Sequence, residues 1–291
     1  RRTGQCVPGI TGLQCTGRTD QSQGMCWRSL STGYGMIQFN QQGCKIHKDQ
    51  LISLPVTKVI QEADDVCTFR LDNSQGLIPP HQPGMFVKVC LDINGVEVWR
   101  SFSISSSPHQ RERIDLTIKR NHAGQVGNYF FDHIHVGSHV FLKGPLGQFH
   151  FDPAQHVEPV ILLCAGIGIT PMMSIVRYLH ATNVNRICYL FYGARTHRDI
   201  IFDQETRDLI TEMPDFHYFL TLSQPVPHWL GYCGQLNFDF MISKIPQVEL
   251  SRFFLCGPRN FNQDFTLRLL EMGVPHELIH SEQFHKKNKT R

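Results

Sequence analysis

The sequence predicts two domains of different architecture, a small antiparallel β-barrel followed by an α/β domain with a doubly wound parallel sheet. From Pro55 onward, apolar and polar residues alternate with a period of two in short runs separated by turns, a pattern typical of antiparallel strands. After Pro159, strand-like runs alternate with helical ones, which favours a parallel sheet. The length of 291 residues suits two such domains.

Composition excludes several classes of protein. Hydrophobic residues make up 41% of the chain and charged residues 18%, as in an ordinary globular protein. The net charge is +3 without a long basic run, so we expect no nucleic-acid partner. The longest apolar run, from Val160 to Met173, contains two glycines and is shorter than the ~20 residues of a membrane helix. We therefore expect no membrane span, and nothing that resembles a secretory signal opens the sequence.

The ten cysteines contain no C-x-x-C pair, which disfavours zinc ribbons and thioredoxin-type redox motifs. Five lie in apolar, strand-like runs, where a thiol packs as a small hydrophobe: Cys67, Cys90, Cys164, Cys188 and Cys256. Four others lie near the N-terminus: Cys6, Cys15, Cys26 and Cys44. Reduced thiols are favoured there over a metal or cluster, and they indicate a reducing compartment, so we expect a cytoplasmic location.

Residues 1–52 are a cysteine-containing segment, rich in Gly, Gln, Ser and Thr, to which the sequence assigns no role. Short strands are expected at Tyr34–Phe39 and Cys44–Leu54. The segment is either a tail or the remnant of a fused domain.

Residues 53–156 are expected to form the barrel. Its predicted strands are Val66–Leu71, Met85–Ile93, Val96–Ile104, Arg113–Lys119 and Val140–Lys143. Asn94-Gly95 predicts a type I′ hairpin turn, in which both residues take a positive φ. One short helix is expected over Val126–Ile134. Consecutive short strands joined by tight turns favour a small antiparallel barrel.

Residues 157–284 are expected to form the α/β domain. Its predicted strands are Val160–Cys164, Ile187–Tyr192, Phe216–Leu222 and Phe253–Leu255. Its predicted helices are Thr170–His180, Gln204–Glu212 and Asn262–Glu271, the last of which is stopped by Gly273.

A glycine-rich turn, from Ala165 to Pro171, follows a buried strand and opens a helix. In that position, backbone N–H groups can approach a phosphate, and the helix N-terminus adds roughly half a positive charge. Pro171 suits the first helical turn, where its missing N–H has no cost. The spacing is G-x-G-x-x-P rather than the dinucleotide fingerprint, so a plain strand-to-helix turn remains an alternative.

A second motif, Arg100-Ser101-Phe102-Ser103, lies on the return strand of the hairpin. Strand alternation puts Arg100 and Phe102 on one face and the two serines on the other. An arginine can bind a phosphate through two N–H groups, an aromatic side chain packs on a planar ring, and a serine hydroxyl can bond a ring nitrogen. The alternative is an edge strand with one exposed cation.

Five short motifs together resemble those of the ferredoxin–NADP reductase superfamily, in the same order and spacing. They are Pro83-Gly84-Met85-Phe86, Arg100-Ser101-Phe102-Ser103, Gly144-Pro145-Leu146-Gly147, Gly166-Ile167-Gly168-Ile169-Thr170-Pro171 and Cys256-Gly257-Pro258. The chain looks most like the reductase components of bacterial oxygenases and the reductases of hybrid-cluster proteins. The resemblance implies an FAD-binding barrel at 53–156, an NAD(P)-binding domain at 157–284 and a basic tail at 285–291.

The resemblance also implies roles for individual residues. Arg100 would hold the FAD pyrophosphate, Phe102 would lie against the flavin or ribityl chain, and Ser103 would face the reactive edge of the ring. Further FAD contacts would come from Ser101, Thr117, Ile118, Lys119, Gly124, Gly127 and Asn128, the last of which is commonly Ser in the family.

On the nucleotide side, the resemblance places Cys256 beside the nicotinamide. Other contacts with the dinucleotide would come from Gly166, Gly168, Thr170, Pro171, Arg195, Gly257 and Pro258. Phe284 resembles the terminal aromatic residue that covers the flavin in some members. Arg195 and Arg198 could pair with the 2′-phosphate of NADPH, whereas Asp199 could disfavour it, and the members most similar in appearance use NADH.

The implied chemistry is hydride transfer from NADH or NADPH to FAD, followed by single electrons to an iron–sulfur acceptor protein in trans. The C-x₄-C-x₂-C spacing of a plant-type [2Fe–2S] domain does not occur in these residues. Either such a domain was lost or truncated, or the acceptor is a separate protein. His133, His135 and His139 lie close together in sequence but lack a carboxylate or Cys partner at ligand spacing, so we expect no metal site. The alternative function is a regulatory module that holds a nucleotide on the same fold without turnover.

Overall fold

The computed structural model describes residues 15–16, 28–32, 35–39, 51–121 and 124–282. The chain divides into two compact units, residues 1–51 and 52–291. In the first unit, three strands pair antiparallel: β1 (Cys15–Thr16), β2 (Arg28–Thr32) and β3 (Gly35–Phe39). Strand β3 confirms the strand predicted at Tyr34–Phe39. Cys6, Cys26 and Cys44 lie outside the described residues.

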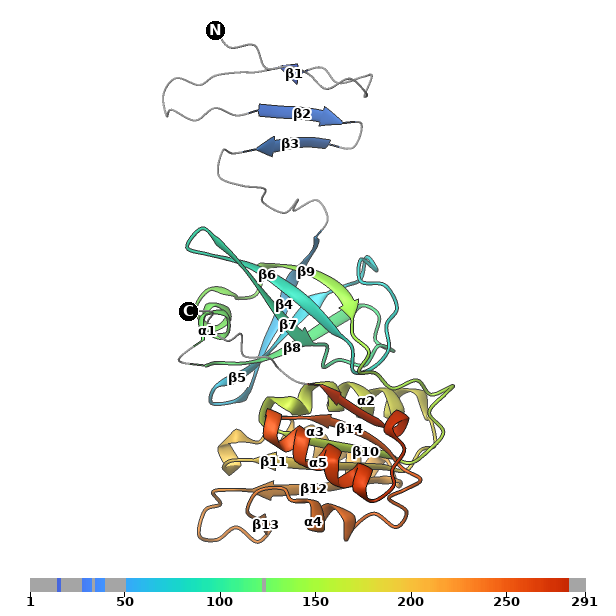
Figure 1. The fold of residues 1–291 in the computed structure, drawn as a ribbon. Coiled ribbons are helices and arrows are strands. Elements are labelled where there is room, and N and C mark those ends of the chain that lie inside the picture. Colours follow the sequence, from blue (N-terminus) through green and yellow to red (C-terminus); the bar gives the residue numbers. More distant parts are fainter. Residues whose placement is uncertain (1–14, 17–27, 33–34, 40–50, 122–123, 283–291) are drawn as a thin grey trace. The chain divides into compact units, whose positions relative to one another are not determined.

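The second unit begins with six antiparallel strands in the order β7-β6-β9-β4-β5-β8 (Figure 1). They are β4 (Ile52–Ala63), β5 (Val66–Asp72), β6 (Phe86–Ile93), β7 (Val96–Ser103), β8 (Arg113–Lys119) and β9 (His139–Leu146). Ile104, directly after β7, forms a bridge with Leu116 of β8 and closes the sheet. Helix α1 (Gln125–His133) packs on the apolar core, where the rings of Phe130 and Phe69 lie 5.0 Å apart. The predicted barrel is confirmed.

The hairpin between β6 and β7 has the predicted turn. Asn94 and Gly95 take φ values of 55° and 77°, as a type I′ turn requires. Strand β4 differs from the prediction, because it begins at Ile52 and extends through Pro55 to Ala63. Residues 52–55 pair with β9 and residues 56–63 with β5. Pro55 lacks a backbone N–H and lies where the strand changes its neighbour. The expected strand Cys44–Leu54 is therefore wrong at its C-terminal end, and residues 44–50 lie outside the described residues.

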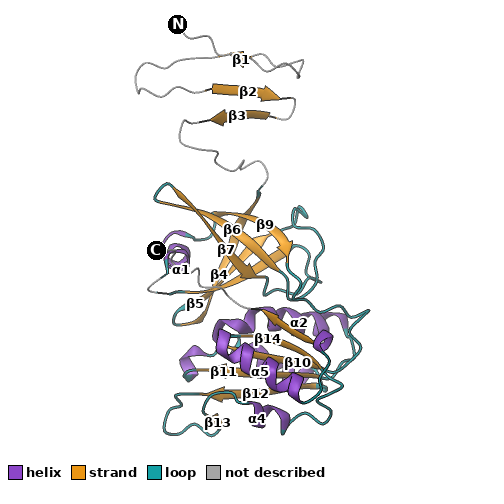
Figure 2. Ribbon diagram, in the orientation of Figure 1, coloured by secondary structure: helices purple, strands orange, loops and turns teal. Residues whose placement is uncertain are grey.

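The α/β part contains a parallel sheet in the order β13-β12-β11-β10-β14-β15 (Figure 2). Its strands are β10 (Val160–Ala165), β11 (Cys188–Ala194), β12 (Phe216–Leu222), β13 (Tyr232–Cys233), β14 (Arg252–Cys256) and β15 (Ile279–Glu282). Helices α2 (Ile169–Thr182) and α3 (Asp203–Glu212) share one apolar cluster with the sheet. Helices α4 (Phe238–Ile242) and α5 (Arg259–Glu271) share another.

This arrangement confirms the doubly wound fold. The chain runs outward from β10 through β11 and β12, then returns and places β14 on the other side of β10. The carboxyl ends of β10 and β14 therefore form the switch point at which open α/β sheets bind ligands. Among the described residues, no helix combines the length and apolarity that a membrane crossing demands.

Candidate functional site

The glycine-rich turn and the end of β14 meet at this switch point. After β10, the chain makes a short 3-10 turn (Gly166–Gly168) and enters α2. A Cβ atom on Gly168 would lie 1.9 Å from the carbonyl oxygen of Cys256, so a side chain has no room there. Gly166 takes a φ of 55°, with open space where a Cβ would point. The structure thus brings together two motifs that are far apart in the sequence.

The N-terminus of α2 has the features of a phosphate site. No side chain caps α2 or the 3-10 turn before it, and the N–H of Ile169 already donates to the carbonyl of Gly166. The N–H groups left for a ligand are therefore those of the 3-10 turn, where the helix dipole favours an anion. Thr170 and Pro171 are buried, and the Thr170 hydroxyl donates a 3.0 Å hydrogen bond to the carbonyl of Ile167. Thr170 therefore stabilises the turn itself.

Cys256 is the last residue of β14 and is fully buried. It lies directly opposite Cys164 in the sheet. Burial raises the pKa of the Cys256 thiol well above its ordinary value, so the sulfur stays protonated and is not a nucleophile. The next residues turn the chain into α5: a Cβ on Gly257 would lie 2.7 Å from the Phe261 ring, and Pro258 precedes the helix.

The flavin-side motif lies at the end of β7 and is far more open. Arg100 and Ser101 are exposed, Phe102 is half-buried, and Ser103 is 5% exposed. The Phe102 ring meets Phe130 edge-on at 5.6 Å. Arg100 makes no hydrogen bond or ion pair with another described residue. Its guanidinium is therefore available for a phosphate group.

The side chains at the end of β8 are engaged within the protein. The Thr117 hydroxyl lies 2.8 Å from that of Thr68, and Ile118 is part of the barrel core. Lys119 pairs with Asp65 at 3.2 Å and with Asp199 at 3.7 Å. A flavin in contact with Thr117 and Ile118 would therefore meet their backbone.

The turn before α1 also depends on a close approach. A Cβ on Gly127 would lie 2.7 Å from the carbonyl oxygen of Lys119, so this glycine lets α1 pack against the end of β8. Gly124 immediately precedes the helix. Asn128, one turn into it, lines a hollow of about 240 Å³ between α1 and the β6–β7 turn.

The segment after β11 is held by its own side chains. The carboxylate of Asp199 accepts hydrogen bonds from the Thr196 backbone and hydroxyl, at 3.0 and 2.6 Å. Arg195, whose side chain is 67% exposed, lies 3.7 Å from the same carboxylate. Burial works to raise the pKa of Asp199, but the Thr196 hydrogen bonds and the charges of Lys119 and Arg195 outweigh it and lower the pKa.

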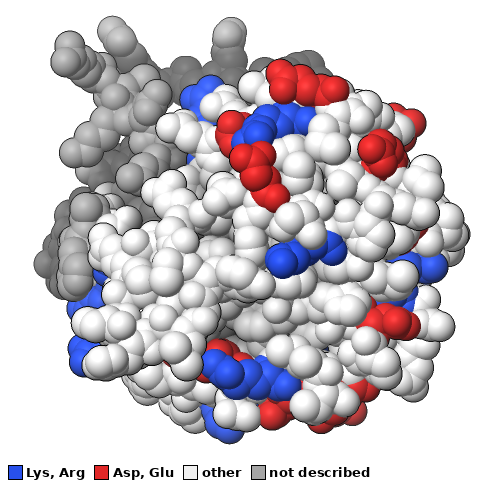
Figure 3. All heavy atoms as spheres, turned by 90° about the horizontal axis from the view of Figure 1, so that it is seen from below, with Lys and Arg blue, Asp and Glu red and all other residues white. Residues whose placement is uncertain are grey.

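Charges of both signs are interspersed on the face shown in Figure 3.

The remaining expectations concern the C-terminal residues and the histidines around α1 and β9. Phe284 and residues 285–291 lie outside the described part of the chain. His139 lies 3.0 Å from the Ser53 hydroxyl, and His133 packs on Tyr129. The described residues contain no cluster of three His, Cys, Asp or Glu side chains that could hold a metal ion.

Sequence reasoning missed a direct connection between the barrel and α2. The Ser174 hydroxyl donates a 2.9 Å hydrogen bond to the carbonyl of Ser106, and Arg177 donates one of 2.5 Å to the carbonyl of Ser105. Both acceptors follow the flavin-side motif by two or three residues, and both donors lie on the helix that starts at the glycine-rich turn. The i, i+4, i+7 spacing of Thr170, Ser174 and Arg177 was the available signal, because it places them on one helix face.

Comparisons with known proteins identify the two domains. Residues 53–151 match the oxidoreductase FAD-binding domain, and residues 162–266 match the oxidoreductase NAD-binding domain. The glycine betaine monooxygenase reductase subunit of Chromohalobacter salexigens is 34% identical over 232 residues, which cover 78% of this chain and 62% of that protein. The ferredoxin reductase component of the 3-ketosteroid-9-alpha-monooxygenase of Mycobacterium tuberculosis is 30% identical over 247 residues, covering 81% and 66%.

A solved structure gives the same result. The FAD/NAD-binding domain of the nitric oxide dioxygenase of Vibrio cholerae superimposes with a TM-score of 0.72 at 26% identity, over 80% of this chain and 98% of that one. The chain spans less than two thirds of the length of the two reductases above. The resemblance drawn from the five motifs is confirmed, and the chain belongs to the ferredoxin–NADP reductase superfamily, whose members join an FAD-binding barrel to an NAD-binding domain.

Proposed function

We propose that this chain passes hydride from NAD(P)H to FAD and delivers the electrons singly to a partner protein that carries an iron–sulfur cluster. One observation carries the proposal. Arg100 at the end of β7, which has no partner among the described residues, and an uncapped, glycine-lined helix start at the sheet switch point occur in one unit. Hydrogen bonds join the segments that follow them. These are two phosphate-binding features, one for each nucleotide cofactor.

The barrel would hold FAD. Arg100 would bind the pyrophosphate, Phe102 would pack along the flavin or ribityl chain, and Ser103 would bond the edge of the ring. When bound, FAD supplies the change from a two-electron hydride to single electrons. Since Ser103 is only 5% exposed, the edge of the ring would lie in a site from which water is largely excluded.

The parallel domain would hold the nicotinamide nucleotide. The backbone N–H groups of the Gly166–Gly168 turn, which leads into α2, would bind its phosphates. Cys256 would support the nicotinamide from behind the Gly168 turn, as a protonated sulfur that acts through its size and polarisability. The Cys256 thiol does not need to exchange a proton, because hydride transfer between the two rings requires no acid or base from the protein.

We propose an oxygenase component or a ferredoxin as the electron acceptor. Two relatives are named as reductase parts of monooxygenase systems. The C-x₄-C-x₂-C spacing of a plant-type cluster does not occur among these 291 residues, so a cluster of that type would lie outside them. We also propose NADH as the favoured donor, because Arg195 is already paired with Asp199 and a 2′-phosphate would have to compete with that ion pair.

We propose a reducing compartment, the cytoplasm, as the location. Cys67, Cys164, Cys188, Cys233 and Cys256 form no disulfide, as expected where glutathione and thioredoxin keep thiols reduced. Titration of thiols in the freshly isolated, unfolded protein tests this, and recovery of disulfide-linked cysteines would contradict it.

The function is tested with protein reconstituted with FAD under anaerobic conditions. We expect NADH to bleach the flavin faster than NADPH, and the reduced protein to pass one electron to each equivalent of an added [2Fe–2S] ferredoxin. The cluster's change in absorbance reports that step. Binding of NADH without any reduction of flavin would overturn the proposal and favour the regulatory module. Flavin reduction without transfer to any [2Fe–2S] protein would overturn the acceptor alone.

A further inference from the structure

The two domains are joined by a small set of polar contacts that we name the Ser–Arg junction. It consists of the backbone carbonyls of Ser105 and Ser106, the side chains of Ser174 and Arg177 on α2, and Glu205 on α3. Ser106 and Ser174 are 1% and 0% exposed, so their 2.9 Å hydrogen bond is shielded from water. Buried hydrogen bonds of this kind hold a specific geometry, because leaving either group unpaired is costly.

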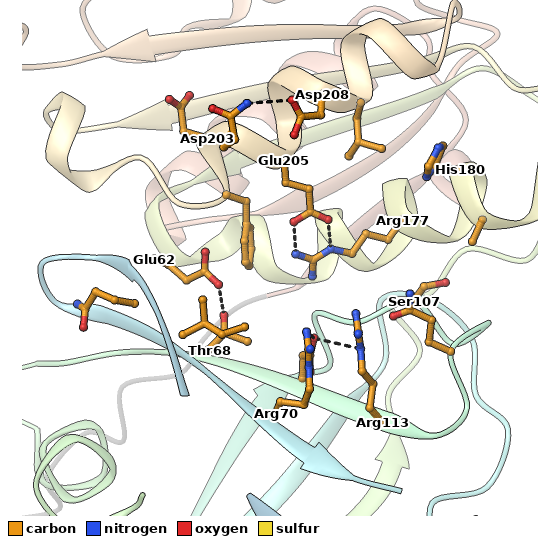
Figure 4. Close-up of a pocket in the computed structure, with 18 of the residues that line it drawn as sticks. Glu62, Thr68, Arg70, Ser107, Arg113, Arg177, His180, Asp203, Glu205 and Asp208 are labelled. Carbon is orange, nitrogen blue, oxygen red and sulfur yellow. Dashed lines mark hydrogen bonds and ion pairs between the residues drawn. The ribbon is translucent and has the colours of Figure 1, made fainter. Parts of the chain in front are cut away.

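Arg177 is the centre of the junction. Its Nε and Nη2 donate to the two carboxylate oxygens of Glu205, at 2.7 and 2.5 Å, while its Nη1 donates to Ser105. The guanidinium also lies 4.5 Å from the centre of the Phe202 ring. The planar guanidinium of Arg177 thus has partners on three sides, which fix its position. Figure 4 shows Arg177 extending from α2 toward Glu205 on α3.

The barrel side of the junction is equally well held. The Ser105 N–H donates to the carbonyl of Asp115 at 2.9 Å, and the Ser106 hydroxyl accepts from the Asp115 N–H at 3.1 Å. Segment 105–106 is therefore bonded to β8 on one side and to α2 on the other. It begins two residues after Ser103, the last residue of the flavin-side motif.

A cavity lies beside the junction. Its volume is about 700 Å³, and it is lined by β4, β5 and β8 of the barrel and by α2 and α3. Arg70 and Arg113 approach it from the barrel (Figure 4), and Arg70 forms two hydrogen bonds with the buried Asp115. None of the residues predicted to bind FAD or the nicotinamide nucleotide lines this cavity. Because side chains do not fill the interface there, the directional bonds of the junction hold α2 on the barrel beside the cavity. Elsewhere the interface contains the Lys119–Asp199 ion pair and the Phe149–Phe254 ring contact.

We propose that Ser174 and Arg177 are positioning residues that fix the distance between the flavin-side motif and the glycine-rich turn. Ser174 and Arg177 lie one and two turns along α2 from Thr170 on the same helix face. A displacement at the junction therefore moves the helix start relative to Ser103. Hydride transfer is sensitive to such displacements, because a misplacement of about 1 Å can cost roughly 100-fold in rate. This inference rests on the proposed function and deepens it.

The test compares Arg177→Met, Arg177→Lys, Ser174→Ala and a control, Arg207→Met. Arg207 pairs with Asp203 within α3 at 3.1 Å, so its replacement removes a similar ion pair that does not involve the barrel. Stopped-flow reduction of the FAD-loaded protein, at a series of NADH concentrations, separates the limiting rate from the dissociation constant of NADH.

We expect Arg177→Met to lower the limiting rate at least about tenfold while the NADH dissociation constant changes less than about threefold. The limiting rate of Arg177→Lys should lie between those of the wild type and Arg177→Met, because an ammonium group cannot reach all three acceptors at once. Ser174→Ala should lower the rate about threefold, and Arg207→Met should leave it unchanged. The charge-transfer absorbance of the stacked flavin and nicotinamide should weaken in parallel, a signal that loss of stability alone would not alter.

Three results separate the possible failures. If folded Arg177→Met, with full FAD, is reduced at the wild-type limiting rate, the positioning role is overturned and the proposed function stands. If Arg177→Met does not fold, Ser174→Ala decides, and a wild-type rate and charge-transfer band in that variant overturn the inference. If NADH does not reduce the wild-type flavin, the proposed function fails and the positioning role fails with it.

Discussion

The two cofactor motifs of this chain are built in opposite ways. On the flavin side, Arg100 lies exposed at the end of β7 without a partner among the described residues. On the nucleotide side, Gly168 and Cys256 are buried and pack so closely that a single added methyl group would lie 1.9 Å from a backbone oxygen. In the proposed function, the first motif would bind its cofactor through an exposed side chain, whereas the second would bind through the shape of the backbone.

The difference predicts which property each substitution changes. A side chain that contacts only solvent in the protein can be removed without much effect on the fold, so a change at Arg100 should appear in cofactor affinity. A glycine at a close backbone contact is part of the packing, so a change at Gly168 should appear first in stability. Substitutions on the two sides therefore separate binding from folding.

The largest expected effect is that of Gly168→Ala. Backbone atoms of β14 cannot move aside for the new methyl group, so we expect a loss above about 3 kcal/mol, beyond the usual cost of overpacking. Gly166→Ala is the matched control in the same turn. An alanine side chain at position 166 would point into open space, so its only cost is the left-handed φ of that residue, about 1–2 kcal/mol. Urea denaturation measures both, and equal losses would show that the close approach to Cys256 is not what selects glycine.

Arg100→Ala should have the next largest effect. Each charge-assisted hydrogen bond to the pyrophosphate is worth about 1.5–3 kcal/mol, so FAD affinity should fall by at least about tenfold in fluorescence titrations. The stability of the apoprotein should not change. Lys58→Ala, which removes an exposed cation elsewhere on the barrel, should leave FAD affinity as it is. An unchanged affinity in Arg100→Ala would remove this residue from the flavin site.

Cys256→Ala tests whether the buried side also affects the reaction. We expect the limiting rate of flavin reduction to fall about tenfold, or roughly 1.4 kcal/mol in the barrier, with FAD still bound. Because the sulfur is fully buried, some loss of melting temperature should accompany the change. Cys188→Ala removes another fully buried thiol, at the start of β11, and should lower stability without slowing reduction. If both variants react at the wild-type rate, Cys256 contributes to packing alone.

The smallest expected effect is a pH dependence of the parallel domain. Burial, together with the charge of Arg252, lowers the pKa of His280 to about 4. The unfolded chain, with an ordinary pKa near 6.5, therefore binds more protons between these values, and stability falls as the pH falls from about 6.5 to about 4. The slope should be about 1 kcal/mol or less per pH unit.

His280→Gln is expected to flatten this dependence in thermal denaturation, whereas His109→Gln, on an exposed loop of the barrel, should preserve it. An equal slope in wild type and His280→Gln would assign the acid sensitivity to other groups.

Much of the fold could be predicted from local patterns. Strand β8 has the predicted bounds, Arg113–Lys119, and Asn94-Gly95 has the predicted φ values. The α/β domain contains three short elements that were not predicted: β13, α4 and β15. Elements of two to five residues contain too few positions to show a period, and their existence depends on a neighbouring strand or helix. The course of β4 was missed for a related reason, because Pro55 argues locally against a strand.

The candidate site was predictable where residue type alone carries the chemistry. Arg100 and the Gly166–Pro171 turn follow from phosphate-binding chemistry, and their spacing with the other motifs supported the family resemblance. The contact of Gly168 with Cys256 and the Ser–Arg junction depend on tertiary packing between segments that are far apart in the chain. A serine-rich loop and one helical arginine have no local signal that pairs them.

Hydride transfer between nucleotides held by these two motifs is tested most directly by anaerobic mixing of FAD-loaded wild-type protein with NADH in a stopped-flow spectrometer. We expect complete loss of the oxidised flavin's visible absorbance, at a rate that saturates with NADH concentration. A flavin that remains oxidised at saturating NADH and NADPH, in protein shown to bind both FAD and nucleotide, would contradict it.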